Sequence, residues 1–229
     1  MSDIPVITVD GPSGSGKGTI SRQIAHQLQW HFLDSGALYR LVALGAMKSG
    51  IELGHEAGLA DYARGLEVRF VSDDPTEEPI ILLDNQDVTA DIRTETCGNA
   101  ASKAAALPAV RQALLQRQRG FLQSPGLVAD GRDMGTTVFP AARLKIFLTA
   151  SAEERAKRRH KQLKEKGIDV NLAALVKDIA ERDQRDGSRA SSPLKPADGA
   201  VILDTSIMGI DEVMAKVNAL ISEMMPDTK

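Results

Sequence analysis

The sequence contains one cysteine, few aromatic residues, no long apolar run and no strong excess of either charge. Because Cys97 is the only cysteine among 229 residues, neither an intrachain disulfide nor a thiolate metal cluster can form. Aromatic residues make up 3% of the chain and the net charge is −3, a combination that argues against nucleic acid as a partner. Residues 1–10 lack a secretion-signal pattern, and no uncharged apolar run reaches the roughly 18 residues of a membrane span. We therefore expect a cytoplasmic protein without a membrane or nucleic-acid partner, in which any polyanion site is built locally.

Apolar periodicity predicts an α/β fold. The predicted strands are 4–9, 30–33, 126–130, 144–148 and 201–203. The predicted helices between and after them are 17–28, 37–48, 153–166, 171–189 and 210–224. Ser151 and Asn171 are expected to cap the third and fourth of these helices. Strands that alternate with helices favour a five-stranded parallel sheet covered by helices on both faces.

The middle of the chain follows a different pattern. Segments 66–70 and 80–83 predict antiparallel strands, with turn-forming residues at 72–75 between them. Helices at 95–107 and 110–122 follow, broken at Pro108. We therefore predict a core formed by 1–62, 107–150 and 190–229, an inserted mixed α/β subdomain at 63–106, and a helical lid region at 151–189.

The strongest single motif is a glycine-rich segment that follows the first predicted strand and opens the first predicted helix. Glycines let the backbone curl around a phosphate, and the helix directs its positive end at the anion. Lys17 adds a mobile charge for the outer phosphates of ATP. A merely flexible glycine turn is the alternative, and the strand–loop–helix context argues against it. The predicted ATP-binding residues are Gly11, Pro12, Ser13, Gly14, Ser15, Gly16, Lys17, Gly18 and Thr19.

This phosphate loop departs from the simple Walker pattern at one position. The pattern places Ser or Thr directly after the lysine to bind Mg²⁺, whereas here Gly18 follows the lysine and Thr19 comes next. We therefore assign no certain metal ligand and expect Mg²⁺ to be held largely through water and ATP oxygens, with Thr19 and Asp130 as candidates. The chain has no [NT]-K-x-D motif, which argues against a GTPase.

Two more charged segments are expected at the sheet edge that carries the phosphate loop, because ligands of a parallel sheet collect at the carboxyl ends of its strands. Tyr39 and Arg40 come shortly after the second predicted strand. Arg132 and Asp133 follow the strand that ends at Asp130. The alternatives are a surface arginine beside a half-buried tyrosine for the first segment, and a structural salt-bridge cluster for the second.

The two helices of the predicted lid region are also charged. Steps of three and four residues along the apolar stripe of helix 171–189 reach Arg182, Asp183 and Asp186, so we expect these side chains to point into a cleft. Plain surface charge is the alternative. On the basic helix 153–166, Arg158 and Arg159 are candidates for stabilising a moving phosphoryl group. For any single basic residue on that helix, solvation is the stronger alternative.

Four motifs together resemble those of one family. They are G-P-S-G-S-G-K-G-T at 11–19, D-S-G-A-L-Y-R at 34–40, D-G-R-D-M-G-T-x-V-F-P at 130–140 and E-R-D-x-R-D at 181–186. In these motifs the chain resembles the bacterial cytidylate kinases, which are P-loop nucleoside monophosphate kinases, and the resemblance covers nearly its whole length. It implies ATP with Mg²⁺ as the donor, CMP or dCMP as the acceptor in pyrimidine metabolism, and an insert that binds the nucleoside monophosphate.

The resemblance also implies roles for single residues. The ribose and the acceptor phosphate are assigned to Ser35, Arg40, Arg132 and Arg189, the cytosine edge to Ser102, Arg111 and Asp133, and the sugar to Arg182 and Asp186. With Tyr39 and Asp130 these form the expected substrate-binding set, and Lys17, Arg132, Arg158 and Arg159 form the expected catalytic set. We expect a monomer. Two alternatives stay open, namely a P-loop kinase of another acceptor such as UMP or AMP, and a non-catalytic ATP-binding module.

Overall fold

The contacts within the chain divide it into two compact units. The structure is a computed structural model that describes residues 4–71, 79–165 and 167–227. One unit comprises Met1–Leu33 and Leu122–Lys229, and we call it the sheet unit. The other comprises Asp34–Phe121, and we call it the helical unit.

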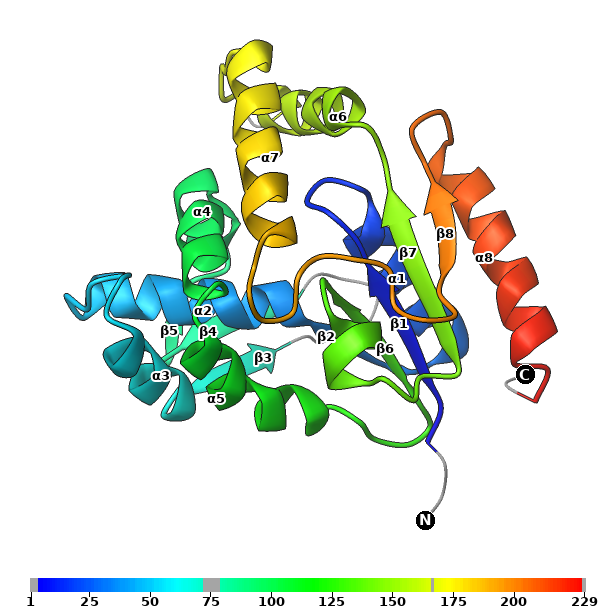
Figure 1. Ribbon diagram of the computed structural model, residues 1–229, viewed down its shortest axis with the longest axis horizontal. Helices are drawn as coiled ribbons and strands as arrows, with labels where there is room; N and C mark the ends of the chain where they lie inside the picture. Colours follow the sequence, from blue (N-terminus) through cyan, green and yellow to red (C-terminus); the bar gives the residue numbers. More distant parts are fainter. Residues whose placement is uncertain (1–3, 72–78, 166, 228–229) are drawn as a thin grey trace. The chain divides into compact units, whose positions relative to one another are not determined.

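A five-stranded parallel sheet forms the centre of the sheet unit (Figure 1). Its strands are β1 (Val6–Asp10), β2 (His31–Asp34), β6 (Leu127–Gly131), β7 (Leu144–Thr149) and β8 (Val201–Asp204), in the order β2-β6-β1-β7-β8. The central strand β1 pairs in parallel with β6 and β7, and all five of its residues are buried. Its β-branched residues suit a strand with neighbours on both sides. The α/β class and the five-stranded sheet are therefore confirmed.

The helices of the sheet unit are α1 (Lys17–Leu28), α6 (Ala152–Glu165), α7 (Leu172–Gly187) and α8 (Ile210–Met224). Helices α1 and α8 pack on one face of the sheet, where Ile24, Ile146 and Val217 belong to one buried core. The predicted caps are confirmed: Ser151 accepts a hydrogen bond from the backbone N–H of Glu154 at 3.2 Å, and Asn171 accepts one from Ala174 at 3.1 Å.

A short π-helical turn, η2 (Met134–Val138), follows β6 and was not predicted. A Cβ atom at Gly135 would lie 2.9 Å from Oγ1 of Thr8, so the glycine lets this turn lie directly on β1. Thr8 is fully buried and points to the face of the sheet opposite the core formed with α1 and α8. The turn therefore belongs to the second face of the sheet.

The helical unit contains five helical segments and three strands among its described residues. They are α2 (Ser35–Lys48), α3 (Glu56–Arg64), the 3₁₀ turn η1 (Asp91–Arg93), α4 (Glu95–Ala104), α5 (Pro108–Arg119), and the strands β3 (Val68–Val71), β4 (Ile80–Leu83) and β5 (Gln86–Asp87). The predicted antiparallel pairing of β3 with β4 is confirmed, and β5 extends that sheet. The turn predicted at 72–75 lies outside the described residues. Pro108 is the first residue of α5, where its missing N–H is harmless, so the predicted helix start at 110 is wrong by two residues.

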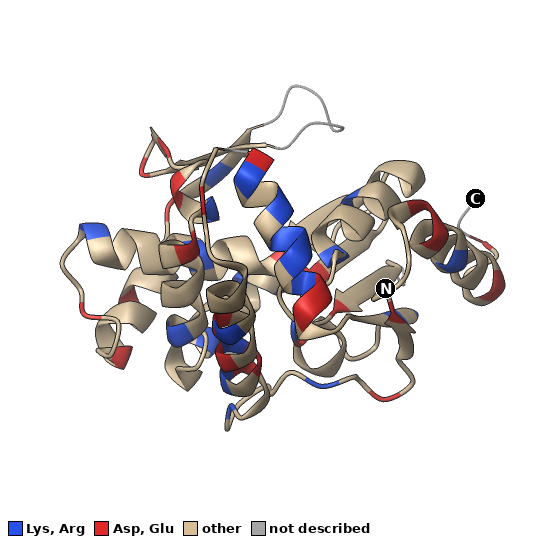
Figure 2. Ribbon diagram, turned by 90° about the horizontal axis from the view of Figure 1, so that it is seen from above, with Lys and Arg blue, Asp and Glu red and all other residues tan. Residues whose placement is uncertain are grey.

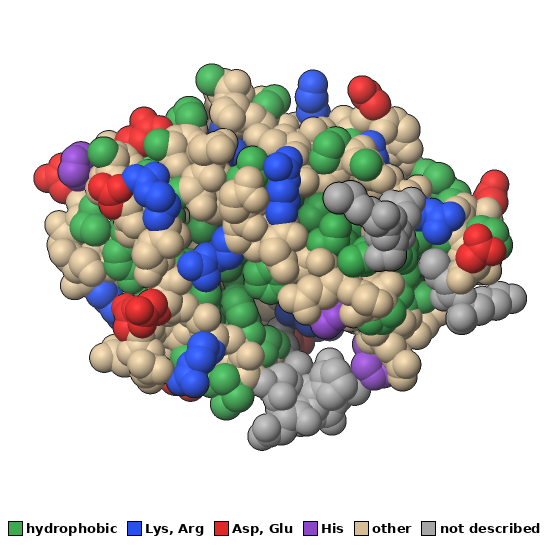
Figure 3. Space-filling model, turned by 90° about the horizontal axis from the view of Figure 1, so that it is seen from below, with side chains coloured by type: hydrophobic (Ala, Val, Ile, Leu, Met, Phe, Trp, Pro, Cys, Tyr) green, Lys and Arg blue, Asp and Glu red, His purple; other side chains and the backbone are tan. Residues whose placement is uncertain are grey.

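The predicted insert, 63–106, lies wholly inside the helical unit, whose bounds are wider because α2 packs on α4 and α3 packs on α5. The division of the chain by function into core, insert and lid stays a prediction. Among the described residues, no helix combines the length and apolarity needed to cross a membrane. On the face drawn in Figure 3, Lys and Arg side chains are scattered among acidic and apolar ones and form no broad basic patch.

Candidate active site

The glycine-rich loop joins β1 to α1, as predicted, and its glycines are required by two close approaches. A Cβ atom at Gly11 would overlap the carbonyl oxygen of Leu148 on β7. Gly14 has a φ of +78°, which side-chain-bearing residues rarely adopt, and a Cβ there would lie 3.2 Å from Cβ of Arg155. Lys17 is buried and its Nζ donates to the carbonyl oxygen of Pro12 at 3.0 Å. The lysine therefore curls over the concave side of the loop.

The loop also contains a buried hydroxyl group, that of Ser15. Ser15 is 1% exposed, and its Oγ has no hydrogen-bond partner among the described residues. The carbonyl oxygen of Ser15 accepts a hydrogen bond from Thr205, which follows β8. A buried polar atom in a loop lined with N–H groups fits an anionic ligand, because a phosphate oxygen would satisfy it.

The carboxylate of Asp130 lies beside the first turn of α1. A Cβ atom at position 18 would sit 3.2 Å from its Oδ2, which explains why glycine stands where the simple Walker pattern has Ser or Thr. Thr19 lies in the same turn, so the two candidate oxygen donors for Mg²⁺ fit the hard ligands that this ion prefers. The residues that the structure describes contain no group of three or more His, Cys, Asp or Glu arranged to hold a metal.

Asp10, the last residue of β1, is a site-forming residue that the sequence reasoning missed. Its Oδ1 accepts from the N–H of Met134 and its Oδ2 from the N–H of Gly135, both at 2.8 Å. Burial raises the pKa of Asp10 to about 7; the two backbone hydrogen bonds oppose the rise, and the charges of Asp133 and Asp130 add to it. The carboxylate thus fixes the turn that directly follows Arg132 and Asp133.

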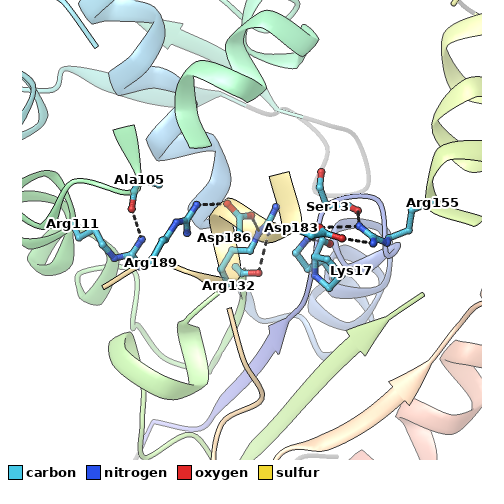
Figure 4. Close-up of polar contacts among 11 residues, drawn as sticks. Ser13, Lys17, Ala105, Arg111, Arg132, Arg155, Asp183, Asp186 and Arg189 are labelled. Carbon is cyan, nitrogen blue, oxygen red and sulfur yellow. Dashed lines mark hydrogen bonds and ion pairs between the residues drawn. The ribbon is translucent and has the colours of Figure 1, made fainter. Parts of the chain in front are cut away.

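Asp186 on α7 gathers two of the predicted acceptor arginines, Arg132 and Arg189 (Figure 4). Nε of Arg132 donates to its Oδ2 at 3.0 Å, and Arg189 pairs with its Oδ1. Burial acts to raise the pKa of Asp186, but the charges of Arg132, Arg189 and Arg182 together hold it below the ordinary carboxyl value. On this face of α7, Asp186 is 1% exposed and Arg182 and Asp183 are half-buried, and their placement in a cleft stays a prediction.

Arg155 at the start of α6 is a second residue that the sequence did not single out. It is 4% exposed and donates to three segments: to the carbonyl oxygen of Ala150 at 2.9 Å, to that of Ser13 at 3.1 Å, and to both carboxylate oxygens of Asp183 (Figure 4). Its neighbours on this helix are also basic, as Figure 2 shows along α6. Burial alone distinguishes Arg155 from them, and burial depends on packing rather than on the residue type.

The two arginines predicted for catalysis on α6 have different surroundings. Arg158 donates to Oγ1 of Thr205 at 3.1 Å and also to the Thr205 carbonyl oxygen, so it anchors the loop after β8. Arg159 donates to Gln162 at 3.3 Å in an exposed setting. Their roles in stabilising a transferring group stay predictions.

In the helical unit, the predicted residues of α2, α4 and α5 form local contacts. The guanidinium of Arg111 lies over the ring of Tyr39, 5.4 Å from its centroid. Arg40 donates to the carbonyl oxygen of Ile92 at 2.6 Å and lies flat on Gly98, where a Cβ would come within 3.1 Å of it. Ser35 and Ser102, the other predicted residues of this unit, are buried.

A parallel sheet whose first strand ends in a phosphate loop with a basic helix against it is the arrangement of a P-loop phosphotransferase. The sequence relatives narrow the class. The family model described as Cytidylate kinase matches residues 7–223. A cytidylate kinase of Shewanella baltica is 54% identical over 98% of this chain and 97% of its own length, and one of Aeromonas hydrophila is 55% identical over 97% and 96%. The chain therefore belongs to the cytidylate kinase family.

Among solved structures, a gluconokinase from Sinorhizobium meliloti 1021 covers 98% of this chain and 95% of its own, with a TM-score of 0.47 and 18% identity. A likeness at this level carries no argument about function.

Proposed function

We propose that this protein transfers the terminal phosphoryl group of ATP to CMP and dCMP, giving the diphosphates. One observation carries the proposal. The sheet unit by itself contains a phosphate loop, in which Lys17 is buried, and a cluster of three arginines around Asp186. Two polyanions brought together need this much positive charge. The names of the relatives, which are 54–55% identical over nearly the whole chain, support a cytidine acceptor.

The mechanism that we propose relies on alignment and charge rather than on a strong base. The acceptor phosphate is largely ionised at neutral pH because its second pKa is about 6, so it can attack without losing a proton to the protein. Lys17 and the N–H groups of the loop bind the outer phosphates of ATP. Mg²⁺, when bound near Thr19 and Asp130, neutralises charge on the phosphates.

Arg132 and Arg189 are proposed to hold the acceptor phosphate. In the structure both are drawn together by Asp186, so their guanidinium groups are already gathered before any anion binds. A planar guanidinium can donate two parallel hydrogen bonds to a phosphate, which an ammonium cannot do. We therefore propose that replacing Arg132 by lysine impairs acceptor binding even though the charge is kept.

Asp133 is proposed to select cytosine. Its carboxylate can accept a hydrogen bond from the exocyclic amine of cytosine, whereas uracil presents an oxygen at that position and would be repelled. Asp133 is 3% exposed and follows Arg132 directly, and Asp10 fixes the turn after it. The roles predicted for Ser35, Tyr39, Arg40, Ser102, Arg111, Arg158, Arg159 and Arg182 remain proposals, as do the cytoplasmic location and the monomeric state.

The test is a coupled assay of ADP release with ATP and Mg²⁺, in which CMP, dCMP, UMP and AMP are compared as acceptors. We expect the highest rates with CMP or dCMP. Lys17→Ala is expected to abolish nearly all activity, and Lys164→Ala, an exposed lysine on α6, is the matched control that retains it. Comparable rates with all four acceptors would contradict the cytosine assignment. ADP release with none of them would instead favour a non-catalytic ATP-binding module.

A further inference from the structure

Arg155 ties the phosphate loop to α7 through one buried guanidinium. Its Nη1 donates both to the carbonyl oxygen of Ser13, at 3.1 Å, and to Oδ1 of Asp183, at 3.0 Å, while Nη2 pairs with the other carboxylate oxygen. Nε is used as well, in a hydrogen bond to the carbonyl oxygen of Ala150, which directly follows β7. The guanidinium therefore has no freedom to move without breaking contacts to three separate segments.

The contact with the loop is steric as well as polar. Gly14 follows Ser13 directly, and its backbone comes so near to the stem of Arg155 that an added Cβ would lie 3.2 Å from the arginine Cβ. A shift of the loop at residues 13 and 14 must therefore displace Arg155, and a shift of Arg155 must displace the loop.

The partner of Arg155 lies one helical turn from the acceptor cluster. Asp183 and Asp186 are three residues apart on α7, so they share one face of the helix. Asp186 pairs with Arg132 and Arg189. A continuous series of ion pairs and hydrogen bonds thus runs from the carbonyl of Ser13 through Arg155 and α7 to the two arginines (Figure 4).

We infer that Arg155 and Asp183 are positioning residues that couple the binding of the nucleoside triphosphate in the phosphate loop to the binding of the acceptor phosphate by Arg132 and Arg189. The inference rests on the proposed function. A triphosphate that orders the loop fixes Arg155, and Arg155 fixes α7 in the orientation that aims the acceptor arginines. Each ligand then binds more tightly when the other is present, by the same factor in both directions.

The experiment measures that factor by calorimetry on the full chain. CMP is titrated into the protein alone and into the protein saturated with Mg²⁺ and a non-hydrolysable ATP analogue. For the wild-type chain we expect CMP to bind at least about 5-fold more tightly with the analogue present, within the range usual for coupled sites. Asp183→Asn, which keeps the shape but removes the charge, is expected to bring the factor close to one and to change CMP affinity without the analogue by less than about 3-fold.

Two further variants and two controls complete the design. Arg155→Lys keeps the charge but cannot bridge Ser13 and Asp183, so it is expected to lose the coupling as Asp183→Asn does, and the double variant to lose no more than either single one. Asp178→Asn on α7 and Lys157→Met on α6 alter exposed side chains of the same helices and are expected to retain the wild-type factor.

The outcomes separate the inference from the proposed function. A wild-type factor near one, or an unchanged factor in Asp183→Asn and Arg155→Lys, overturns the inference. So does an equal loss of affinity with and without the analogue, which a merely structural role would produce. If Arg155→Lys fails to fold, Asp183→Asn decides alone. Absence of CMP binding and of turnover in the wild-type chain contradicts the proposed function itself. Normal wild-type turnover, together with a coupling factor that Asp183→Asn and Arg155→Lys leave unchanged, contradicts only the inference.

Discussion

Replacing Asp10 by asparagine is expected to change how the stability of the sheet unit depends on pH. Asp10 is 3% exposed and its pKa is raised to about 7, chiefly by burial and further by the charges of Asp133 and Asp130. In the unfolded chain the pKa of the same carboxyl is near the ordinary aspartate value of 3.8. Between these two values the folded protein binds more protons at this position than the unfolded chain does. The free energy of unfolding therefore falls as pH rises through this window.

The size of the effect follows from the two pKa values. Each pH unit well inside the window changes the free energy of unfolding by about 1.4 kcal/mol. Between about pH 5 and about pH 7.5 the contribution of Asp10 amounts to roughly 2.5 kcal/mol, with the protein more stable at the lower pH. In Asp10→Asn this contribution is absent, so the difference in stability between variant and wild type must depend on pH by that amount.

The single tryptophan provides the assay. Trp30 belongs to the sheet unit and packs against its core, so urea unfolding followed by tryptophan fluorescence reports on the unit that contains Asp10. Asp178→Asn, which removes an exposed carboxylate of the same unit, is the control for the loss of one acidic group. If the stability difference between wild type and Asp10→Asn were the same at both pH values, the account of Asp10 as a buried carboxyl with a raised pKa would be refuted.

Three other substitutions test the packing and the acceptor cluster. Gly45→Ala on α2 places a methyl group on the Tyr62 hydroxyl and is expected to destabilise the protein by about 1–3 kcal/mol. Gly187→Ala adds a methyl group that meets nothing within 4 Å and is expected to stabilise the protein by roughly 0.5 kcal/mol. Thermal unfolding measures both changes, and two shifts of the same sign would contradict the expectation. Asp186→Asn leaves Arg132 and its neighbours without their buried counter-charge and is expected to destabilise by about 3–5 kcal/mol at neutral pH. Because the pKa of Asp186 is lowered, wild type loses this advantage only as pH falls below the ordinary carboxyl range, so a difference already absent at about pH 6 would refute the ion-pair role.

The elements with strong local signals were predicted well. Helix α1 begins at Lys17 and ends at Leu28, the bounds that its apolar spacing predicts, and α7 begins after the cap residue Asn171. The continuation of the apolar stripe on α7 placed Asp183 and Asp186 on the buried face, because helix geometry carries a pattern from one turn to the next.

Elements with weak local signals were missed. Helix α3 has a buried face of only Leu59, Ala60 and Ala63, and two small alanines make a faint apolar stripe. The turn η2 has no local signal at all, since the N–H groups of its first two residues are held by Asp10, which is distant in sequence. No periodicity can reveal such a contact.

The candidate site, like the fold, contains residues that a local sequence pattern predicts and residues that only tertiary packing reveals. The phosphate loop has a motif because every phosphate-binding loop needs glycines in a fixed pattern, and its position between β1 and α1 is confirmed. Arg155 is part of no such motif, because its sequence context matches that of Arg158 and Arg159. Only the packing of α6 against the loop and α7 separates a buried bridging arginine from two that reach other partners.

The transfer of labelled phosphorus from the γ-position of ATP tests the central claim most directly. With Mg²⁺ and CMP present, the account predicts that the label appears in the β-phosphate of CDP and not as inorganic phosphate, and that Lys17→Ala abolishes its appearance. Label released only as inorganic phosphate, or label that stays in ATP while CMP is unchanged, would contradict it.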